Sequence, residues 1–205
     1  MTQRALLMAI MEPTPAMEEE FNDWYDLEHL PQMRAVPGID TAARFVAVDG
    51  WPRYLAVYDL QEFAVLRSAA YRSMTGSGFT AWSRRMLAHV KGWQRLTFKQ
   101  LAPGHATIGG DSGALLVYVC KGSPDLGPVA DTLSREPGVI QARAFGPGEE
   151  TNDGAALLVE AGAVGTLPRP PASLLAEAAP VFSAAYVRYT RIDPVARFHS
   201  LENRD

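Results

Sequence analysis

The chain contains 205 residues, of which 47% are hydrophobic and 20% are charged, and its formal net charge at pH 7 is −4. This composition is typical of a globular protein with a buried core, and the negative charge without a run of Lys and Arg argues against a nucleic-acid partner. The single cysteine, Cys120, excludes an internal disulfide. No apolar stretch approaches the roughly 20 residues of a membrane span, so we expect a soluble, cytoplasmic protein with no membrane partner.

The first helix carries the most unusual group of side chains in the chain. Its start is indicated by Thr14 as the cap and by Pro15 at the first helical position, followed by glutamates at 18–20. Because the residue before a proline is disfavoured in the α region, we expect this helix to end near His29, before Pro31. The C-terminus of a helix favours the protonated form of a histidine, so we expect His29 to be readily protonated.

Strands and helices alternate through the rest of the first half. Apolar and β-branched runs predict strands over residues 4–11, 39–48, 54–60 and 92–101. Helical patterns cover residues 62–70 and 80–90, and Thr80 is the expected cap of the second helix. The resulting order, βαββαβ, is that of a ferredoxin-like unit.

The same order returns after the glycine-containing loop at 102–112. Strands are predicted over residues 113–120, 139–145, 155–160 and 184–192, with helices over 125–135 and 172–178. The pairs Pro37–Gly38 and Pro137–Gly138 lie 100 residues apart, each just before a strand, and this matched order favours a duplication over chance. The predicted division is a first repeat at 1–101, a linker at 102–112, a degenerate second repeat at 113–193 and a C-terminal tail at 194–205.

The first strand of each repeat is apolar on both faces, so both faces of each sheet must be covered. A ferredoxin-like sheet has helices on one face only. Two such sheets that pack face to face, or close into a barrel, would cover the other face within one chain. We therefore expect an α+β fold of two ferredoxin-like repeats, with a small-molecule cavity inside the barrel.

Residues 21–45, FNDWYDLEHLPQMRAVPGIDTAARF, resemble the EthD-like branch of the dimeric α+β barrel superfamily in a helix that ends in His-x-Pro, a Pro-Gly pair and a strand. The resemblance is best over residues 1–100 and implies that the barrel usually made by two subunits forms here from a tandem repeat. Members of the superfamily include cofactor-free monooxygenases, lactone isomerases, decarboxylases, cyclases and haem-binding branches. The resemblance places His29 where EthD-like and methylmuconolactone-isomerase-like proteins carry a functional histidine. The second repeat has no counterpart of His29, which implies one active pocket per chain.

His29 is the leading candidate for an acid or base because imidazole titrates near neutrality. Its alternative role is to cap the end of the helix or to form a hydrogen bond with a turn. Glu28 lies within the apolar stripe of the helix and is a candidate proton shuttle, with a salt bridge to Arg34 or Arg44 as the alternative. The hydroxyl of Tyr25 completes the expected catalytic group.

Aromatic side chains are concentrated in the first repeat and suit an apolar or aromatic ligand, although each can equally belong to the core. The expected substrate-binding group is Trp24, Phe45, Tyr58, Tyr71 and Trp82. The glycines at 76 and 78 precede Trp82 and indicate a flexible cover over the barrel mouth. Asp26 lies on the polar face of the helix and is expected only to be solvated.

The residues predict no metal site, because the four histidines are scattered and no HxH or paired-cysteine spacing occurs. Haem needs a single axial ligand, which His29 or His89 could supply, but we expect no cofactor.

The leading hypothesis is a cofactor-independent isomerase, or a lyase such as a decarboxylase, that acts on a small apolar or aromatic molecule as a monomer or homodimer. The alternatives are a cofactor-free monooxygenase and a non-catalytic binding protein for a hydrophobic small molecule.

Overall fold

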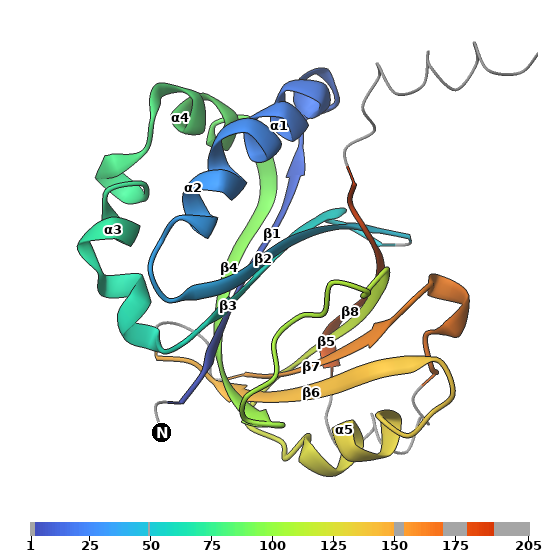
Figure 1. The fold of residues 1–205 in the computed structure, drawn as a ribbon. Helices are drawn as coiled ribbons and strands as arrows, with labels where there is room; N and C mark the ends of the chain where they lie inside the picture. Colours follow the sequence, from blue (N-terminus) through green and yellow to red (C-terminus); the bar gives the residue numbers. More distant parts are fainter. Residues whose placement is uncertain (1–2, 49, 150–153, 170–179, 191–205) are drawn as a thin grey trace, which may run out of the picture.

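Eight antiparallel strands close into a barrel in the computed structural model, which describes residues 3–48, 50–149, 154–169 and 180–190 (Figure 1). The strands are β1 (Ala5–Pro13), β2 (Ile39–Ala47), β3 (Tyr54–Leu60), β4 (Val90–Ala102), β5 (Ala114–Cys120), β6 (Val139–Pro147), β7 (Ala155–Ala161) and β8 (Pro180–Arg188). The α-helices are α1 (Glu18–Trp24), α2 (Leu30–Arg34), α3 (Ala69–Arg72), α4 (Ala81–Leu87) and α5 (Gly127–Leu133). A π turn, η2 (Tyr25–His29), joins α1 to α2. Short 3₁₀ turns are η1 (Pro15–Met17), η3 (Phe63–Arg67), η4 (Gly76–Gly78) and η5 (Val164–Thr166).

Each half of the chain contributes four strands in the same spatial order. β4, β1, β3 and β2 lie side by side in the first half, and β8, β5, β7 and β6 in the second. The halves join where β2 pairs with β8 and β4 pairs with β6, so none of the described strands is left at an open edge. The expected single-chain α+β barrel is confirmed, whereas the division into repeats at 102–112 stays a prediction.

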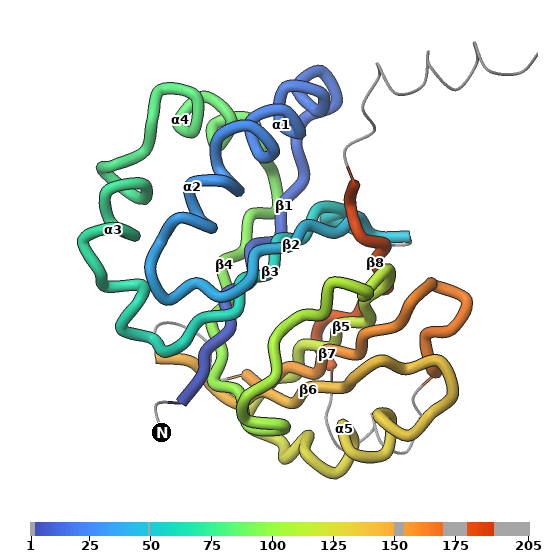
Figure 2. Tube along the Cα trace, viewed as in Figure 1, coloured from blue at the N-terminus to red at the C-terminus, as the bar shows by residue number. Residues whose placement is uncertain are grey.

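Helices cover the outer face of the barrel in both halves. Figure 2 shows α1, α2, α3 and α4 together on the side of the first-half strands, and α5 beside β6 on the opposite side. Each helical layer packs its own apolar core against the sheet beneath it. Within the described residues, no helix has the length and apolar character needed to cross a membrane.

Side chains fill the interior of the barrel and form a third core. Its largest fully buried members are Leu6, Met8, Ile10, Phe45, Phe98, Phe145 and Tyr186. An eight-stranded barrel is just wide enough for its inward side chains to fill it. Phe45 is one of these core residues, and the cavity described below lies on the helix-covered outer face of the sheet. The expected role of Phe45 in substrate binding stays a prediction.

The helix boundaries differ in part from those expected. Thr14 makes no capping hydrogen bond, because the 3₁₀ turn η1 precedes α1. Thr80 does cap α4: its side-chain oxygen accepts a hydrogen bond from the backbone N–H of Ser83 at 2.9 Å. The expected helix at 62–70 is a 3₁₀ turn followed by the short α3. The last strand begins four residues before the expected 184, and the expected helix at 172–178 lies outside the described residues.

A buried ion network joins β3 of the first half to β6 and β7 of the second. Arg143 donates from Nη1 to Oδ1 of Asp59 at 2.6 Å and from Nε to Oε1 of Glu160 at 3.1 Å. The loop before β5 adds backbone donors, since the N–H of Ile108 bonds Asp59 at 2.7 Å and the N–H of Gly109 bonds Glu160 at 2.9 Å. All three charged side chains are fully buried, so the loss of one leaves the others without their compensating charge.

Replacing the shared cation should therefore destabilise the barrel. We expect Arg143→Met to lower the free energy of unfolding by about 3–5 kcal/mol, because Asp59 and Glu160 stay buried without a cation. Arg67→Ala, which breaks a half-exposed pair with Glu149, should cost less than about 1 kcal/mol. Urea denaturation of both variants measures the difference, and equal losses would contradict a stabilising role for the buried network.

Candidate functional site

A cavity of about 360 Å³ lies between the outer face of the first-half sheet and the helices that cover it. Its floor is formed by Leu7, Ala9, Met11 and Tyr58 from β1 and β3. Its helical wall is formed by Trp24, Tyr25, His29 and Met33. The remaining walls include Tyr71, Thr75, Phe79, Trp93 and Arg95. The volume lies within the range of small-molecule sites, and most of the lining is apolar or aromatic.

The small side chain of Ala9 lines this space in the middle of the sheet. Ala9 on β1 pairs with Ala56 on β3 and with Arg95 on β4, so two alanines occupy neighbouring positions in the middle of the outer face. The next outward pair along these strands is bulkier, with Leu7 opposite Tyr58. The cavity thus lies where the side chains of the sheet extend least towards the helices.

The helix that forms the wall does not end at His29. The backbone N–H of Leu30 donates to the carbonyl of Tyr25, as in a π-helix, and the helix then continues through Pro31 to Arg34. Proline has no N–H, and its ring clashes with the preceding turn of a regular α-helix, so a wider turn accommodates it. The expected end of the helix before Pro31 is wrong for this reason.

The π turn also brings the His29 ring onto Trp24. Their centroids lie 4.8 Å apart with 17° between the ring planes, and Tyr25 meets His29 edge-on at 5.3 Å. On an α-helix, residues five positions apart point in directions about 140° apart. The stack of Trp24 on His29 therefore depends on the extra residue of the π turn. These two aromatic contacts orient the imidazole on the cavity wall.

Burial lowers the pKa of His29 to about 4, and the positive charge of Arg44 adds to the shift. The Nδ1 atom is buried and has no hydrogen-bond partner among the described residues. His29 is therefore neutral at pH 7 and can accept a proton. The expected preference for the protonated form is wrong, because burial disfavours the charged imidazole, the cation Arg44 lies nearby, and the helix continues past His29.

That cation, Arg44, connects the helix to the sheet and to the second half of the chain. Its guanidinium carbon lies 4.4 Å from the ring centroid of Tyr25 and 4.2 Å from that of Tyr189, which follows β8. It also donates hydrogen bonds to Asp26 and to Asn22, each at 2.6 Å. Asp26 is thus half of an ion pair, and the expectation that it is only solvated is wrong.

Tyr25 and Tyr58 contribute two phenol groups to the cavity. Both side chains are fully buried, and burial raises the pKa of each phenol, most strongly that of Tyr58. The positive charge of Arg44 opposes the shift at Tyr25 without reversing it. Both phenols keep their protons at pH 7 and can donate hydrogen bonds to an oxygen atom of a ligand.

Glu28 lies behind the cavity wall. Its Oε1 accepts hydrogen bonds from the hydroxyl of Thr80 at 2.6 Å and from that of Ser83 at 3.2 Å. The indole N–H of Trp24 donates to the same Ser83 hydroxyl at 3.1 Å. Glu28 therefore connects the start of α4 to the π turn and is not among the residues that line the cavity. Its expected role as a proton shuttle stays a prediction.

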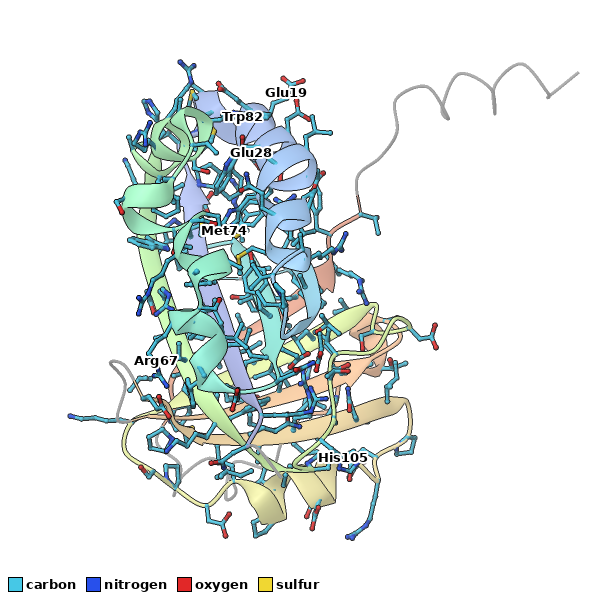
Figure 3. All side chains as sticks on the ribbon, turned by 60° about the vertical axis from the view of Figure 1, so that its left-hand side comes forward. Glu19, Glu28, Arg67, Met74, Trp82 and His105 are labelled. Carbon is cyan, nitrogen blue, oxygen red and sulfur yellow. The ribbon has the colours of Figure 1, made fainter. Side chains whose placement is uncertain are left out.

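The expected substrate-binding aromatics separate into two groups. Trp24, Tyr58 and Tyr71 line the cavity. Trp82 packs against the edge of the outer core, and Figure 3 shows it near Glu28 at the top of the helical layer. Trp82 is not among the residues that line this cavity, and its expected role in substrate binding stays a prediction. Met33, Trp93 and Arg95 line the cavity without having been expected, although the alternation of a β-strand places Trp93 and Arg95 on one face.

The fold is shared with several solved structures. An anthrone oxidase-like protein superposes with a TM-score of 0.68 over 93% of this chain and 92% of its own, at 12% sequence identity. A candidate monooxygenase from Fusobacterium nucleatum gives a TM-score of 0.60 over 91% and 92% of the two chains, at 8% identity. A haem-binding protein from Thermus thermophilus gives 0.54 over 98% and 96%, at 10% identity. No family model matches the chain, and no curated protein matches its sequence significantly.

These similarities place the chain in the dimeric α+β barrel fold. Each of the three structures matches over more than nine-tenths of both chains, so the likeness extends over the whole barrel. At these levels of identity the likeness concerns the fold, and the chemistry has to be argued from the residues of this cavity.

The low pKa of His29 predicts a pH-dependent contribution to stability. The unfolded imidazole binds a proton below its ordinary pKa of 6.5, whereas the folded one stays neutral down to about pH 4. The contribution of neutral His29 to the unfolding free energy is therefore complete above pH 6.5 and is lost as the pH falls towards 4. Between pH 7 and pH 4.5, the wild-type protein should lose about 2 kcal/mol more unfolding free energy than His29→Gln.

Urea unfolding at the two pH values measures this difference. The matched control is His105→Gln, because His105 is exposed and lies near α5, far from the first-half helices in Figure 3. This control should lose the same free energy as the wild type. Equal losses in the wild type and in His29→Gln would show that the fold does not hold His29 neutral.

Proposed function

We propose that the protein is a cofactor-independent oxygenase that removes a proton from a small aromatic substrate. The observation that carries the proposal is the neutral imidazole of His29 on the wall of a cavity lined with aromatic rings. A neutral imidazole in such a position can act as a general base. The resemblance of residues 21–45 to EthD-like proteins also supports a catalytic histidine at this position.

The proton is transferred first. A substrate with an acidic CH2 group that is conjugated to a ketone through aromatic rings gives one proton to His29, and the negative charge spreads onto the ketone oxygen. The phenol groups of Tyr25 and Tyr58 donate hydrogen bonds to that oxygen and so stabilise the anion.

Molecular oxygen then reacts with the anion. The anion gives one electron to O₂, and the two radicals combine to form the C–O bond of a peroxide anion. This anion takes the proton back from His29. Loss of water from the hydroperoxide leaves a second carbonyl group, so the substrate supplies all the electrons and no cofactor is consumed.

The structural neighbours favour an oxygenase over the isomerase or lyase that is the leading hypothesis from the sequence. Two of them are described as an anthrone oxidase-like protein and a candidate monooxygenase. An isomerase or lyase remains the second candidate, because it would use the same proton transfer to His29 without oxygen. A protein that only binds a hydrophobic molecule would need the cavity but not the neutral base.

A structural neighbour is described as haem-binding, but haem fits the cavity of this chain poorly. Haem carries two propionates, whereas Arg95 is the one cation among the residues that line the cavity. The described residues contain no group of three side chains that could hold a metal ion.

The proposed reaction can be tested by measuring oxygen consumption with anthrone as the test compound. The wild-type protein should consume one O₂ per anthrone, and His29→Gln should reduce the rate by about 10²–10⁴-fold, the usual share of general acid–base catalysis. His105→Gln should remain within a few-fold of the wild type. An oxygen electrode and the absorbance of the quinone product measure both variants.

An anaerobic experiment in D₂O separates the alternatives. Exchange of the acidic hydrogen for deuterium that requires His29, without oxygen consumption in air, would favour the isomerase or lyase. Neither exchange nor oxygen consumption, with anthrone bound and unchanged, would favour a binding protein. Normal turnover by His29→Gln would remove the central assignment.

A further inference from the structure

We propose that Ser83 on α4 is a positioning residue for His29, because its hydroxyl holds the indole ring on which the imidazole stacks. The proposal rests on the proposed function only in treating His29 as the base. It starts from the buried side of the imidazole, where Nδ1 has no hydrogen-bond partner among the described residues. A functional histidine is commonly oriented by a hydrogen bond at one ring nitrogen. On the buried side of this ring that hydrogen bond is missing, so another contact has to set the plane of the imidazole.

The stack on Trp24 is that contact, with ring centroids 4.8 Å apart and ring planes 17° apart. Trp24 is 1% exposed, and its one polar side-chain atom, the indole nitrogen, donates to Oγ of Ser83 at 3.1 Å. Phe21 and Tyr25 also pack on the indole, with centroids at 5.9 and 4.7 Å. Hydrophobic burial is non-directional, whereas a hydrogen bond weakens steeply when it is bent. The bond to Ser83 therefore restricts the plane of the indole more than the apolar contacts do.

The hydroxyl of Ser83 is itself held in one direction. It donates its single proton to Oε1 of Glu28 at 3.2 Å, so the lone pairs of its oxygen remain available to the indole N–H. Ser83 is 1% exposed, so bulk water cannot replace it as the acceptor. A buried indole N–H without an acceptor is unfavourable, which favours the one ring position that reaches Ser83.

The hydrogen bonds from Ser83 reach both sides of the imidazole. Glu28 precedes His29 in the π turn η2, and Trp24 is the last residue of α1. Figure 1 shows α4, which carries Ser83, beside α1. Ser83 is not among the residues that line the cavity. Its effect on the reaction therefore has to pass through Trp24 and His29, not through a contact with the substrate.

Nuclear magnetic resonance tests the position of the imidazole without any turnover. In protein with isotope-labelled histidine, the ring protons of His29 are identified by their absence from His29→Gln. The ring current of Trp24 should shift these signals upfield of those of His105, which is exposed. In Ser83→Ala the upfield shift should decrease, because the indole is no longer held. Unchanged His29 signals in Ser83→Ala would overturn the proposal.

The kinetic test measures kcat and KM for oxygen consumption with anthrone. Ser83→Ala should lower kcat by about 10–10²-fold, as expected for a small misplacement of a reacting group, and should leave KM within a few-fold. In Trp24→Phe, which lacks the indole N–H, the same change should have little further effect, since the two residues act through one hydrogen bond. Equal losses of kcat in the two backgrounds would contradict a role of Ser83 through Trp24.

Thr80→Val is the matched control. It removes the cap of α4 and the other hydroxyl that binds Oε1 of Glu28, but it leaves the hydrogen bond between Trp24 and Ser83. It should lower the urea midpoint, while the His29 signals stay in place and kcat remains within a few-fold of the wild type. The same loss of shift and of kcat as in Ser83→Ala would overturn the proposal, since the attachment of α4 alone would then explain both. If Ser83→Ala does not fold, Trp24→Phe removes the same bond from its other end, and an unchanged kcat there would also overturn the proposal.

This proposal and the proposed function can fail separately. The His29 signals decide the role of Ser83 even in a protein that consumes no oxygen, a result that would contradict the proposed function alone. Oxygen consumption by the wild type, with unchanged signals and unchanged kcat in Ser83→Ala, would overturn the role of Ser83 and leave His29 as the base.

Discussion

The filled interior of the barrel is the constraint on which the position of the site depends. The inward side chains of the eight strands pack into a core, and the cavity lies on the outer face instead. That face is covered by helices, and a cavity forms where the small side chain of Ala9 leaves room beneath them. Closure through the β2–β8 and β4–β6 pairs makes this possible in one chain, because no second subunit is needed to complete the sheet.

Arg44 links this architecture to the chemistry. It lies on β2, stacks on Tyr25 of the π turn and on Tyr189 after β8, and pairs with Asp26. One side chain thus holds the cavity wall against the sheet and connects both halves of the chain. The same charge helps to keep His29 neutral. The second half of the chain therefore contributes to the site through the surroundings of Arg44, although it has no histidine of its own there.

The sequence predicted the order of the elements well, because hydrophobic periodicity and Pro-Gly pairs are local signals. It also predicted that His29, Trp24 and Tyr25 lie together, since they share one helix. The errors concern features that depend on distant contacts. Phe45 and Arg44 lie on opposite faces of β2. Closure of the barrel turns the face with Phe45 inward, so Phe45 belongs to the interior core and Arg44 does not. Glu28 finds its partners at Thr80 and Ser83, more than 50 residues away. Arg95 becomes part of the site only when β4 pairs with β1.

The π turn makes the site depend on the length of one short segment. Leu27 lies in the middle of that turn and is 58% exposed, so it adds a residue to the helix without adding to the core. If this residue were lost, the turn could return to α-helical spacing while the barrel and its cores kept their side chains. Trp24 and His29 would then be four positions apart, a spacing that also places two side chains on one face of an α-helix. The pair can therefore meet across five positions in a π turn or across four positions in a regular helix. The spacing between Trp24 and Pro31 thus indicates which of the two turns the helix contains.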